Sequence, residues 1–243
     1  MNEIIRQLFE RKSIRVFEDK KIEPEKKRLI LEAAAMAPTA GNQQLYTILD
    51  ITDPRIKKQL VDTCDHQPFI ASADLVLIFC ADCKKWYDAF LEAGCQPRDP
   101  EVGDLLLAVD DALIAAQNAV TAAQSLGIGS CYIGDIMENC EAQRALLKLP
   151  QYVFPAAMLV FGYPTGQQQD RKKPERIPME YLVHENGYHV MGAEELRNMF
   201  AKNTRSKGYE EWMAAFCKRK YNSDFSREMS RSVAEYLKDY LKK

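Results

Sequence analysis

The sequence has little of several features that define large classes of proteins. Its 243 residues include only three histidines, so we do not expect a histidine-rich metal centre. Lys and Arg number 33 against 35 Asp and Glu, and this balance argues against a partner that is a nucleic acid or a membrane surface. We see no apolar run long enough to span a bilayer, and the polar start MNEIIRQLFERK lacks the apolar core of a signal peptide. We therefore expect a cytoplasmic protein.

Familiar catalytic patterns are also missing. The chain contains no GxSxG, HExxH, GxxxxGK[ST] or EF-hand loop. GIGSCYIG, at 127–134, is superficially similar to the glycine fingerprint of dinucleotide-binding sites. It follows a helical pattern instead of a strand, however, and Tyr132 stands where the third glycine is expected. We therefore reject a Rossmann-type nucleotide site.

The cysteines are odd in number, seven in all, which favours reduced thiols over a disulfide framework. One CxxC occurs, from Cys80 to Cys83, at the end of the apolar run LVLIFC. No second CxxC is present to complete a metal site. We expect these two cysteines to serve packing, with a redox or metal role as the alternative.

The pattern of apolar residues predicts one large domain with helices and strands in alternation, followed by a helical tail. The run 73–82 is nearly continuously apolar, as in a strand that is buried on both faces. The stretch 104–127 is apolar over most of its circumference and predicts a buried helix with one polar stripe, which contains Asp110, Asp111, Gln117 and Asn118. Other strands are expected at 46–52, 130–133 and 156–164. Other helices are expected at 3–12, 22–38 and 54–64, between the strand at 130–133 and residue 149, and in three stretches of 193–243. We expect 165–178 to be a basic loop and 181–190 to be an extended segment.

Five polar stretches lie at the boundaries of these elements. RKSIR, at 11–15, follows a helix, where cations complement the helix dipole, but its fork-shaped guanidinium groups also suit a phosphate. MAPTAGNQQ, at 36–44, is either a plain polar turn or a set of donors and acceptors for the edge of a heterocycle. The remaining three are HQPFI at 66–70, CYIGD at 131–135 and RKKPERIP at 171–178.

Together, the order and spacing of these stretches resemble the nitroreductase family of FMN-dependent NAD(P)H oxidoreductases. The resemblance extends from residue 5 to about residue 190 and includes LPQYVFPAAMLVFGYP. SLGIGSCYIG, VHEN and the extended C-terminal helices are similar to the branch with oxygen-insensitive NADPH nitroreductases and NADPH:flavin oxidoreductases. The resemblance implies an α+β fold with a central, mainly antiparallel sheet flanked by helices. It also implies an FMN-binding domain at 1–190, and a helical extension at 191–243 that packs on the domain or on a partner subunit.

The same resemblance implies roles for single residues. Arg11, Ser13 and Arg15 match the phosphate and flavin contacts of the family, with Arg15 near the N1/O2 edge of the ring, and Lys12 joins this set unless it faces solvent. Gln67 matches an amide that faces the ring. The remaining implied contacts are Tyr132, Ile133 and Gly134, whose backbone lies beside the ring, and Pro38, Thr39 and Asn42, which come from the other subunit of a homodimer with FMN at its interface.

Two further basic stretches have implied roles that stay open. The closing Lys-Pro-Arg of the family is here Lys173-Pro-Glu-Arg176, so the phosphate contact falls to Arg171, Lys173 or Arg176. The 2′-phosphate of NADPH needs a cation elsewhere, for which Arg205 in the TRSKG stretch is the candidate, with a solvated turn as the alternative.

The implied activity is ping-pong, two-electron hydride transfer from NADPH or NADH to nitroaromatics, quinones or related small acceptors, with no catalytic side chain beyond a cation that stabilises reduced flavin. Two alternatives use the same contacts. One is an NADPH:flavin reductase that releases reduced flavin to a partner protein. The other is a flavin carrier or redox sensor without turnover.

Overall fold

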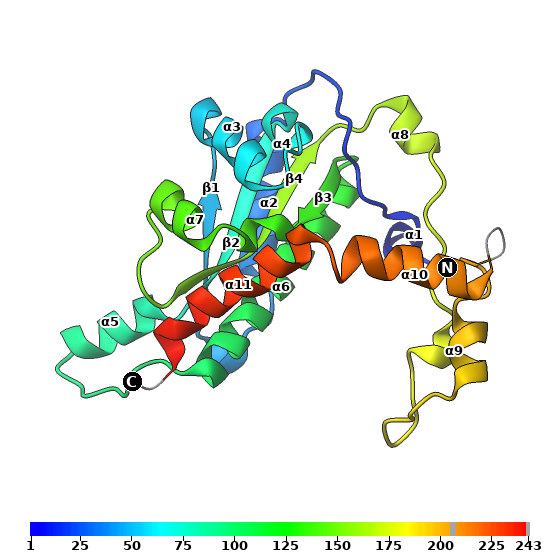
Figure 1. Cartoon of the computed structure of the whole chain (residues 1–243). Helices are drawn as coiled ribbons and strands as arrows, with labels where there is room; N and C mark the ends of the chain where they lie inside the picture. The colour runs from blue at the N-terminus through cyan, green and yellow to red at the C-terminus, as the bar shows by residue number, and fades with distance from the viewer. Residues whose placement is uncertain (205–207, 242–243) are drawn as a thin grey trace. The chain divides into compact units, whose positions relative to one another are not determined.

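The computed structural model describes residues 1–204 and 208–241 (Figure 1). Contacts within the chain divide it into two units. The first comprises Met1–Arg171 and Glu228–Lys243, and the second comprises Lys172–Arg227. The sequence suggested a division at residue 190, but here the chain leaves the first unit at 171 and returns to it at 228.

The first unit is a sheet with helices on both faces. Its strands are β1 (Tyr46–Asp50), β2 (Leu75–Asp82), β3 (Gly129–Ile133) and β4 (Val153–Gly162). Its helices, with α11 entering from the second unit, are α1 (Glu3–Glu10), α2 (Pro24–Ala35), α3 (Pro54–Thr63), α4 (Phe69–Ser72), α5 (Lys84–Glu92), α6 (Val102–Ser125), α7 (Cys140–Leu147), α8 (Gly166–Asp170) and α11 (Asp224–Leu237), with short 3₁₀ turns η1 (Ala40–Asn42), η2 (Gly134–Met137) and η4 (Lys238–Tyr240).

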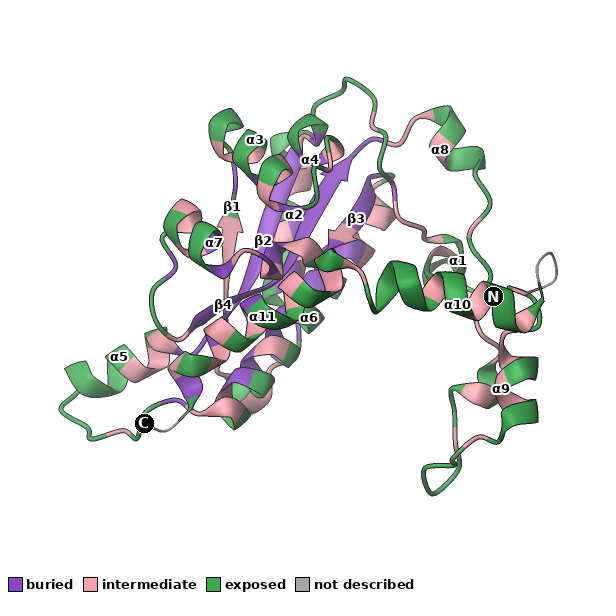
Figure 2. Ribbon diagram, viewed as in Figure 1, coloured by how far each residue is buried: buried purple, intermediate pink, exposed green. Residues whose placement is uncertain are grey.

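The four strands lie in the order β1-β2-β4-β3, and every neighbouring pair is antiparallel. This confirms the predicted α+β class with an antiparallel sheet between helices. β2 and β4 occupy the centre and are buried along their whole length, as Figure 2 shows in purple. The continuous apolar run at 73–82 therefore does mark a strand that is covered on both faces.

Helix α6 is the long core helix that the apolar pattern predicted. Asp104 starts it by accepting a hydrogen bond from the amide of Glu101 at 2.8 Å, and Gly127 follows its end with a φ of +73°. Among the described residues α6 is also the one helix whose length and composition would allow it to cross a membrane, but 44% of its most apolar window is buried inside the protein. Its alanines pack against α2 and the sheet.

The segment after α1 crosses the edge of the sheet. The amide of Ile14 donates to the carbonyl of Ser130 at 2.9 Å, and Ser13 forms a parallel bridge with Ser130. Gly129 makes this crossing feasible, because a Cβ there would lie 2.6 Å from Cγ1 of Ile14. The glycines of GIGSCYIG therefore end a helix and admit the N-terminal segment, which is a different task from cradling a dinucleotide.

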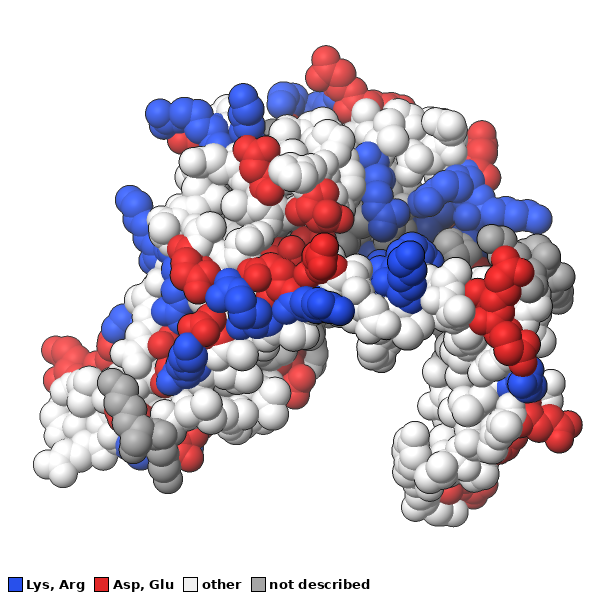
Figure 3. Space-filling view, in the orientation of Figure 1, with Lys and Arg blue, Asp and Glu red and all other residues white. Residues whose placement is uncertain are grey.

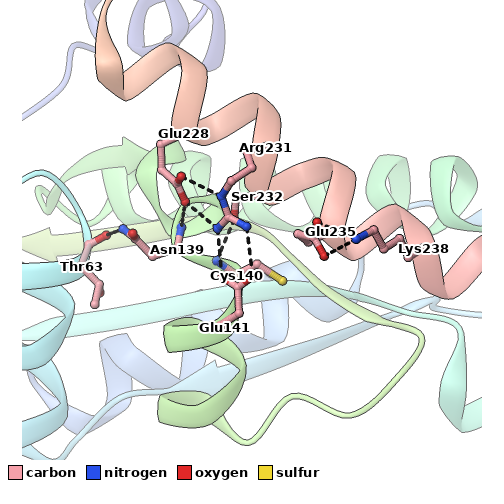
Figure 4. Close-up of polar contacts among 9 residues, drawn as sticks. All are labelled: Thr63, Asn139, Cys140, Glu141, Glu228, Arg231, Ser232, Glu235 and Lys238. Carbon is pink, nitrogen blue, oxygen red and sulfur yellow. Dashed lines mark hydrogen bonds and ion pairs between the residues drawn. The ribbon is translucent and has the colours of Figure 1, made fainter.

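The end of the chain packs on the first unit through α11 (Figure 4). The amide of Cys140, at the start of α7, donates to Oγ of Ser232 at 2.8 Å, and Arg231 forms an ion pair with Glu141 at 2.9 Å. Tyr236 is fully buried, with its ring 5.1 Å from that of Phe154. Part of the predicted C-terminal extension therefore completes the core of the sheet domain.

The second unit consists of η3 (Met179–Tyr181), α9 (Ala193–Met199) and α10 (Tyr209–Lys220), with the first residues of α11. Trp212 stacks on Phe216 at 4.9 Å, and Arg197 pairs with Glu210 at 2.6 Å. Residues 181–190 were expected to be extended. They form turns and irregular backbone instead, and no described residue in this range belongs to a strand.

Candidate functional site

The first group of predicted site residues gathers where the N-terminal segment meets the end of α8. The guanidinium of Arg171 donates to the carbonyl of Ser13. In return, the ammonium of Lys12 donates to the carbonyls of Gln169 and Arg171. The two basic stretches, more than 150 residues apart in sequence, are thus tied together. Lys12 therefore holds the C-terminal end of α8 against the N-terminal segment.

Two cations of this group, Arg15 and Arg171, lack carboxylate partners among the described residues. Among the described residues neither Arg15 nor Arg171 forms an ion pair, and the Ser13 hydroxyl forms no hydrogen bond. Two guanidinium groups without carboxylate partners and a hydroxyl without a hydrogen bond are the donors that a phosphate dianion prefers.

Two cations of the N-terminal segment each lie near an aromatic ring. The Arg15 guanidinium lies 6.0 Å from the ring of Phe69, and that of Arg11 lies 5.9 Å from the ring of Tyr132. Burial raises the pKa of the Tyr132 phenol to about 12, with the charge of Arg11 acting in the opposite direction. Tyr132 is therefore a neutral, half-buried ring at the end of β3.

Gln67 stands in the short connection between α3 and α4, beside this aromatic group. Its Nε2 donates to the carbonyl of Cys64 at 3.1 Å, which fixes the side chain and leaves its carbonyl oxygen without a partner among the described residues. Ile133 is buried against Ile70 and Cys64, whereas Gly134 is exposed and begins η2. The structure thus brings Gln67 and the 132–134 backbone to the same side of the sheet.

The second group of predicted residues lies in the loop after α2. Pro38, Thr39 and Asn42 belong to a tight turn that leads into β1. Gly41, Asn42 and Gln44 have φ values of +56°, +57° and +48°, in the left-handed region that favours glycine. Two of these three are not glycine, so the turn stores conformational strain.

The N-terminal segment of the first group and the turn of the second lie at opposite ends of the sheet within one chain. Tyr46, which follows the turn, pairs with Ala81 and is thereby level with Phe154 on β4. Ser130, which carries the N-terminal segment, pairs with Phe161. Seven residues of β4 separate these levels, or about 23 Å along the strand at about 3.3 Å per residue.

The remaining predicted residues lie outside these groups. Lys173 and Arg176 belong to the second unit, where Arg176 is exposed. Arg205, the NADPH candidate, and its neighbour Lys207 lie outside the described residues. Cys80 and Cys83 are buried free thiols whose pKa is raised to about 12 by burial, so they are poor nucleophiles even though Cys83 directly precedes α5.

Sequence reasoning missed one residue of this arrangement. Asp111, in the polar stripe of α6, is buried and accepts hydrogen bonds from the second group, and we had interpreted the whole stripe as a core feature. A carboxylate on an otherwise apolar helix face was the available signal, because a buried charge requires partners somewhere.

Comparisons with known proteins identify the family to which this chain is similar. The model of the nitroreductase family matches residues 8–163. The FMN reductase [NAD(P)H] of Bacillus subtilis is 33% identical over 97% of this chain and 91% of its own length. The oxygen-insensitive NADPH nitroreductase of Salmonella typhimurium is 36% identical over 77% of this chain and 75% of its own length. Among solved structures, the NfrA1 nitroreductase of Bacillus subtilis has a TM-score of 0.78 and 27% identity over 93% of this chain and 98% of its own.

Proposed function

The chain belongs to the nitroreductase family, and we propose that it is an FMN-dependent NAD(P)H oxidoreductase that reduces nitroaromatics, quinones or related small acceptors. The relatives named above are an FMN reductase [NAD(P)H] and an NADPH nitroreductase. The observation that carries the proposal is the joining of the two basic stretches through Lys12, Ser13 and Arg171, with the neighbouring Arg11 near the Tyr132 ring.

The phosphate end of FMN fits the first group. Ser13, Arg15 and Arg171 have side-chain donors without carboxylate partners, which is the chemistry that a phosphate with nearly two negative charges requires. Of the three residues left open by the sequence, Arg171 lies against Ser13. We therefore assign the phosphate contact to Arg171, with Lys173 and Arg176 as further candidates from the second unit.

The ring end fits the neighbouring side chains and backbone. Bound FMN would supply the redox chemistry, taking a hydride from NADPH or NADH and passing two electrons to the acceptor in a ping-pong cycle. Arg15 supplies a fixed positive charge that favours negative charge on a ligand, and each 1.4 kcal/mol of that preference shifts an equilibrium about tenfold. Gln67 presents an amide, while Tyr132, Ile133 and Gly134 give the ring a partly dry neighbourhood.

The separation of the two groups supports a homodimer with FMN at its interface. In one chain, Pro38, Thr39 and Asn42 lie about 23 Å along the sheet from the level of Ser13. A two-fold axis would bring the 38–44 turn of one subunit to the first group of the other, so that each FMN touches both subunits.

Exposed apolar side chains support the same assembly. Ile4 and Ile5 on α1, and Leu106, Leu113 and Ile114 on α6, are between 38% and 64% exposed. These two helices pack against each other within the chain, so the residues contribute to neighbouring surfaces. Apolar side chains of this size on adjacent helices are typical of a subunit interface.

A second candidate function is an NADPH:flavin reductase that releases reduced flavin, and the FMN reductase among the relatives favours it. Both functions place the protein in the cytoplasm, where NADPH is available. A flavin carrier or redox sensor uses the same contacts without turnover.

The test is to add NADPH anaerobically to the FMN-loaded protein and to follow absorbance in the flavin band. Bleaching is expected, and persistent colour would refute both enzyme functions in favour of the carrier. Recovery of the band with a nitroaromatic or with free FMN then ranks the two acceptors. Protein that binds no FMN at all would refute the cofactor assignment.

A further inference from the structure

Asp111 is a buried carboxylate in the middle of an apolar helix. Its residue is 3% exposed, and its neighbours on the buried face of α6 are alanines. A carboxylate in such a place is costly unless donors surround it. No described Lys, Arg or His forms an ion pair with Asp111, so its partners have to be neutral groups.

All the partners of Asp111 come from the turn between α2 and β1. Oδ1 accepts from the amide of Ala40 at 3.0 Å, and Oδ2 accepts from the amide of Leu45 at 3.0 Å. Oδ2 also accepts from the hydroxyl of Thr39. The carboxylate therefore holds both ends of the 39–45 loop on one rigid helix.

The loop needs such an anchor because its backbone is strained. Between the two anchored ends, Asn42 and Gln44 adopt positive φ values that cost non-glycine residues about 1 kcal/mol or more each. Strained backbone persists only where surrounding contacts over-determine it. The three hydrogen bonds to the Asp111 carboxylate hold the loop backbone in this conformation.

The hydroxyl of Thr39 forms two hydrogen bonds inside the chain. It donates to Asp111 and accepts from the amide of Gln44 at 2.8 Å. Its proton is therefore not available to a ligand. The exposed groups that the loop offers to a ligand come from Pro38, Gly41, Asn42 and Gln44, and their positions depend on the Thr39–Asp111 bond.

Two other polar side chains of α6 hold neighbouring segments. Asn118 donates to the carbonyl of Ala33, in the last turn of α2, at 3.1 Å. Gln117 accepts from the hydroxyl of Tyr132 at 3.4 Å. The polar stripe thus contacts the helix before the loop, the loop itself and the end of β3.

We propose that Asp111 is a positioning residue for flavin binding: it fixes the 39–45 loop in the strained conformation with which one subunit completes the FMN site of the other. The inference rests on the proposed function. Because Asp111 acts only through the loop, its loss weakens FMN binding without removing any atom that touches the ligand.

The principal test is the dissociation constant of FMN for Asp111→Asn, measured on purified, folded protein by quenching of flavin fluorescence. The amide keeps the shape but turns one acceptor into a donor that faces another donor. We expect the dissociation constant to rise about tenfold or more. As a matched control, Asp88→Asn removes an exposed helix carboxylate that pairs with Lys84, and it should bind FMN as the wild type does.

A second pair of variants keeps the proposal testable if Asp111→Asn does not fold. Thr39→Val removes the hydroxyl that donates to Asp111, whereas Thr39→Ser retains it. In FMN-free protein, Thr39→Val should speed hydrogen exchange at the amides of Ala40 and Leu45 and Thr39→Ser should restore protection. A direct contact of Thr39 with FMN alone would weaken binding without changing this exchange.

The outcomes separate the two levels of inference. Wild-type protein that binds no FMN refutes the proposed function and the role of Asp111 with it. Wild-type binding together with unchanged binding by Asp111→Asn refutes the positioning role alone. If the amides of Ala40 and Leu45 exchange in Thr39→Val at the wild-type rate, the positioning role alone is likewise refuted.

Discussion

Asp111 and Glu138 are two buried acidic residues, at 3% and 5% exposed, that differ in their hydrogen-bond partners. Asp111 accepts three hydrogen bonds from one loop. Oε1 of Glu138 is buried without a hydrogen-bond partner among the described residues. Asp111 holds a loop in place, whereas Oε1 of Glu138 holds no neighbouring group among the described residues.

The difference follows from what faces each group. Donors from a neutral loop surround Asp111, whereas Glu138 stands near the acidic side chains of Asp135, Asp65 and Glu228. Burial, followed by these negative charges, raises the pKa of Glu138 from 4.5 to about 7. Acidic side chains also gather over α7 and α11 in Figure 3. Burial alone therefore does not say whether an acid stabilises its site; its hydrogen-bond partners do.

The largest expected effect is on stability after removal of the partnered acid. Asp111→Ala leaves the amides of Ala40 and Leu45 and the hydroxyl of Thr39 without acceptors, at a cost of about 3 kcal/mol or more. Chemical denaturation of the FMN-free protein measures it. Asp88→Ala, on the exposed face of α5, should change the free energy of unfolding by less than about 1 kcal/mol. Equal costs for the two variants would erase the distinction drawn for Asp111.

The next effect concerns cations, where partners again decide the outcome. Arg171→Ala removes a guanidinium that lies against Ser13, and the dissociation constant of FMN should rise about tenfold or more, as expected for a charge-assisted contact. Arg176→Ala serves as the control from the same basic stretch and should have the smaller effect. If the order is reversed, the phosphate contact belongs to the second unit.

The unpartnered acid should respond to pH. Its pKa is about 7 in the folded protein and 4.5 when exposed, so the folded state binds its proton more tightly and stability falls as pH rises through this window. Glu138→Gln removes this loss. The variant should match the wild type near pH 4.5 and exceed it on the order of 2 kcal/mol above pH 7. Denaturation at both pH values measures the difference, and a constant difference would show that Glu138 does not carry the effect.

The smallest effect concerns the cap that α11 places on α7. Ser232→Ala leaves the amide of Cys140 without its acceptor and should cost about 1 kcal/mol. Ser125→Ala, which removes an exposed hydroxyl at the end of α6, is the comparison. Thermal unfolding of the two variants measures the difference, and an equal shift would mean that Ser232 is not a cap.

Much of the fold could be predicted because its signals are local. The run LVLIFCAD is a strand buried on both faces, and most of 104–127 is the core helix. Both could be predicted because the spacing of apolar residues and the residues that end a helix are local features of the sequence. RKSIR, APTAGNQQ and YIGD lie at the ends of elements as expected. Their order along the chain could be read without knowing any contact.

The rest depends on partners far away in sequence. Asp111 meets Thr39 across 72 positions, and Ser232 meets Cys140 across 92. Neither bond has a periodic signal, so the polar stripe of α6 resembled an incidental core feature. Residues 181–190 were expected to be extended, but they form turns and irregular backbone.

The most direct test of a flavin site shared between two subunits is a mixed dimer. Arg15→Ala and Asp111→Asn chains with different affinity tags are co-expressed, and dimers that carry both tags are isolated. If each site takes Arg15 from one subunit and the 39–45 loop from the other, one site of the mixed dimer has both lesions and the other is intact. It should bind about half as much FMN as the wild type, with wild-type affinity, while both parent homodimers bind weakly. Weak binding at both sites of the mixed dimer would place Arg15 and the loop in the same subunit's site and contradict the account.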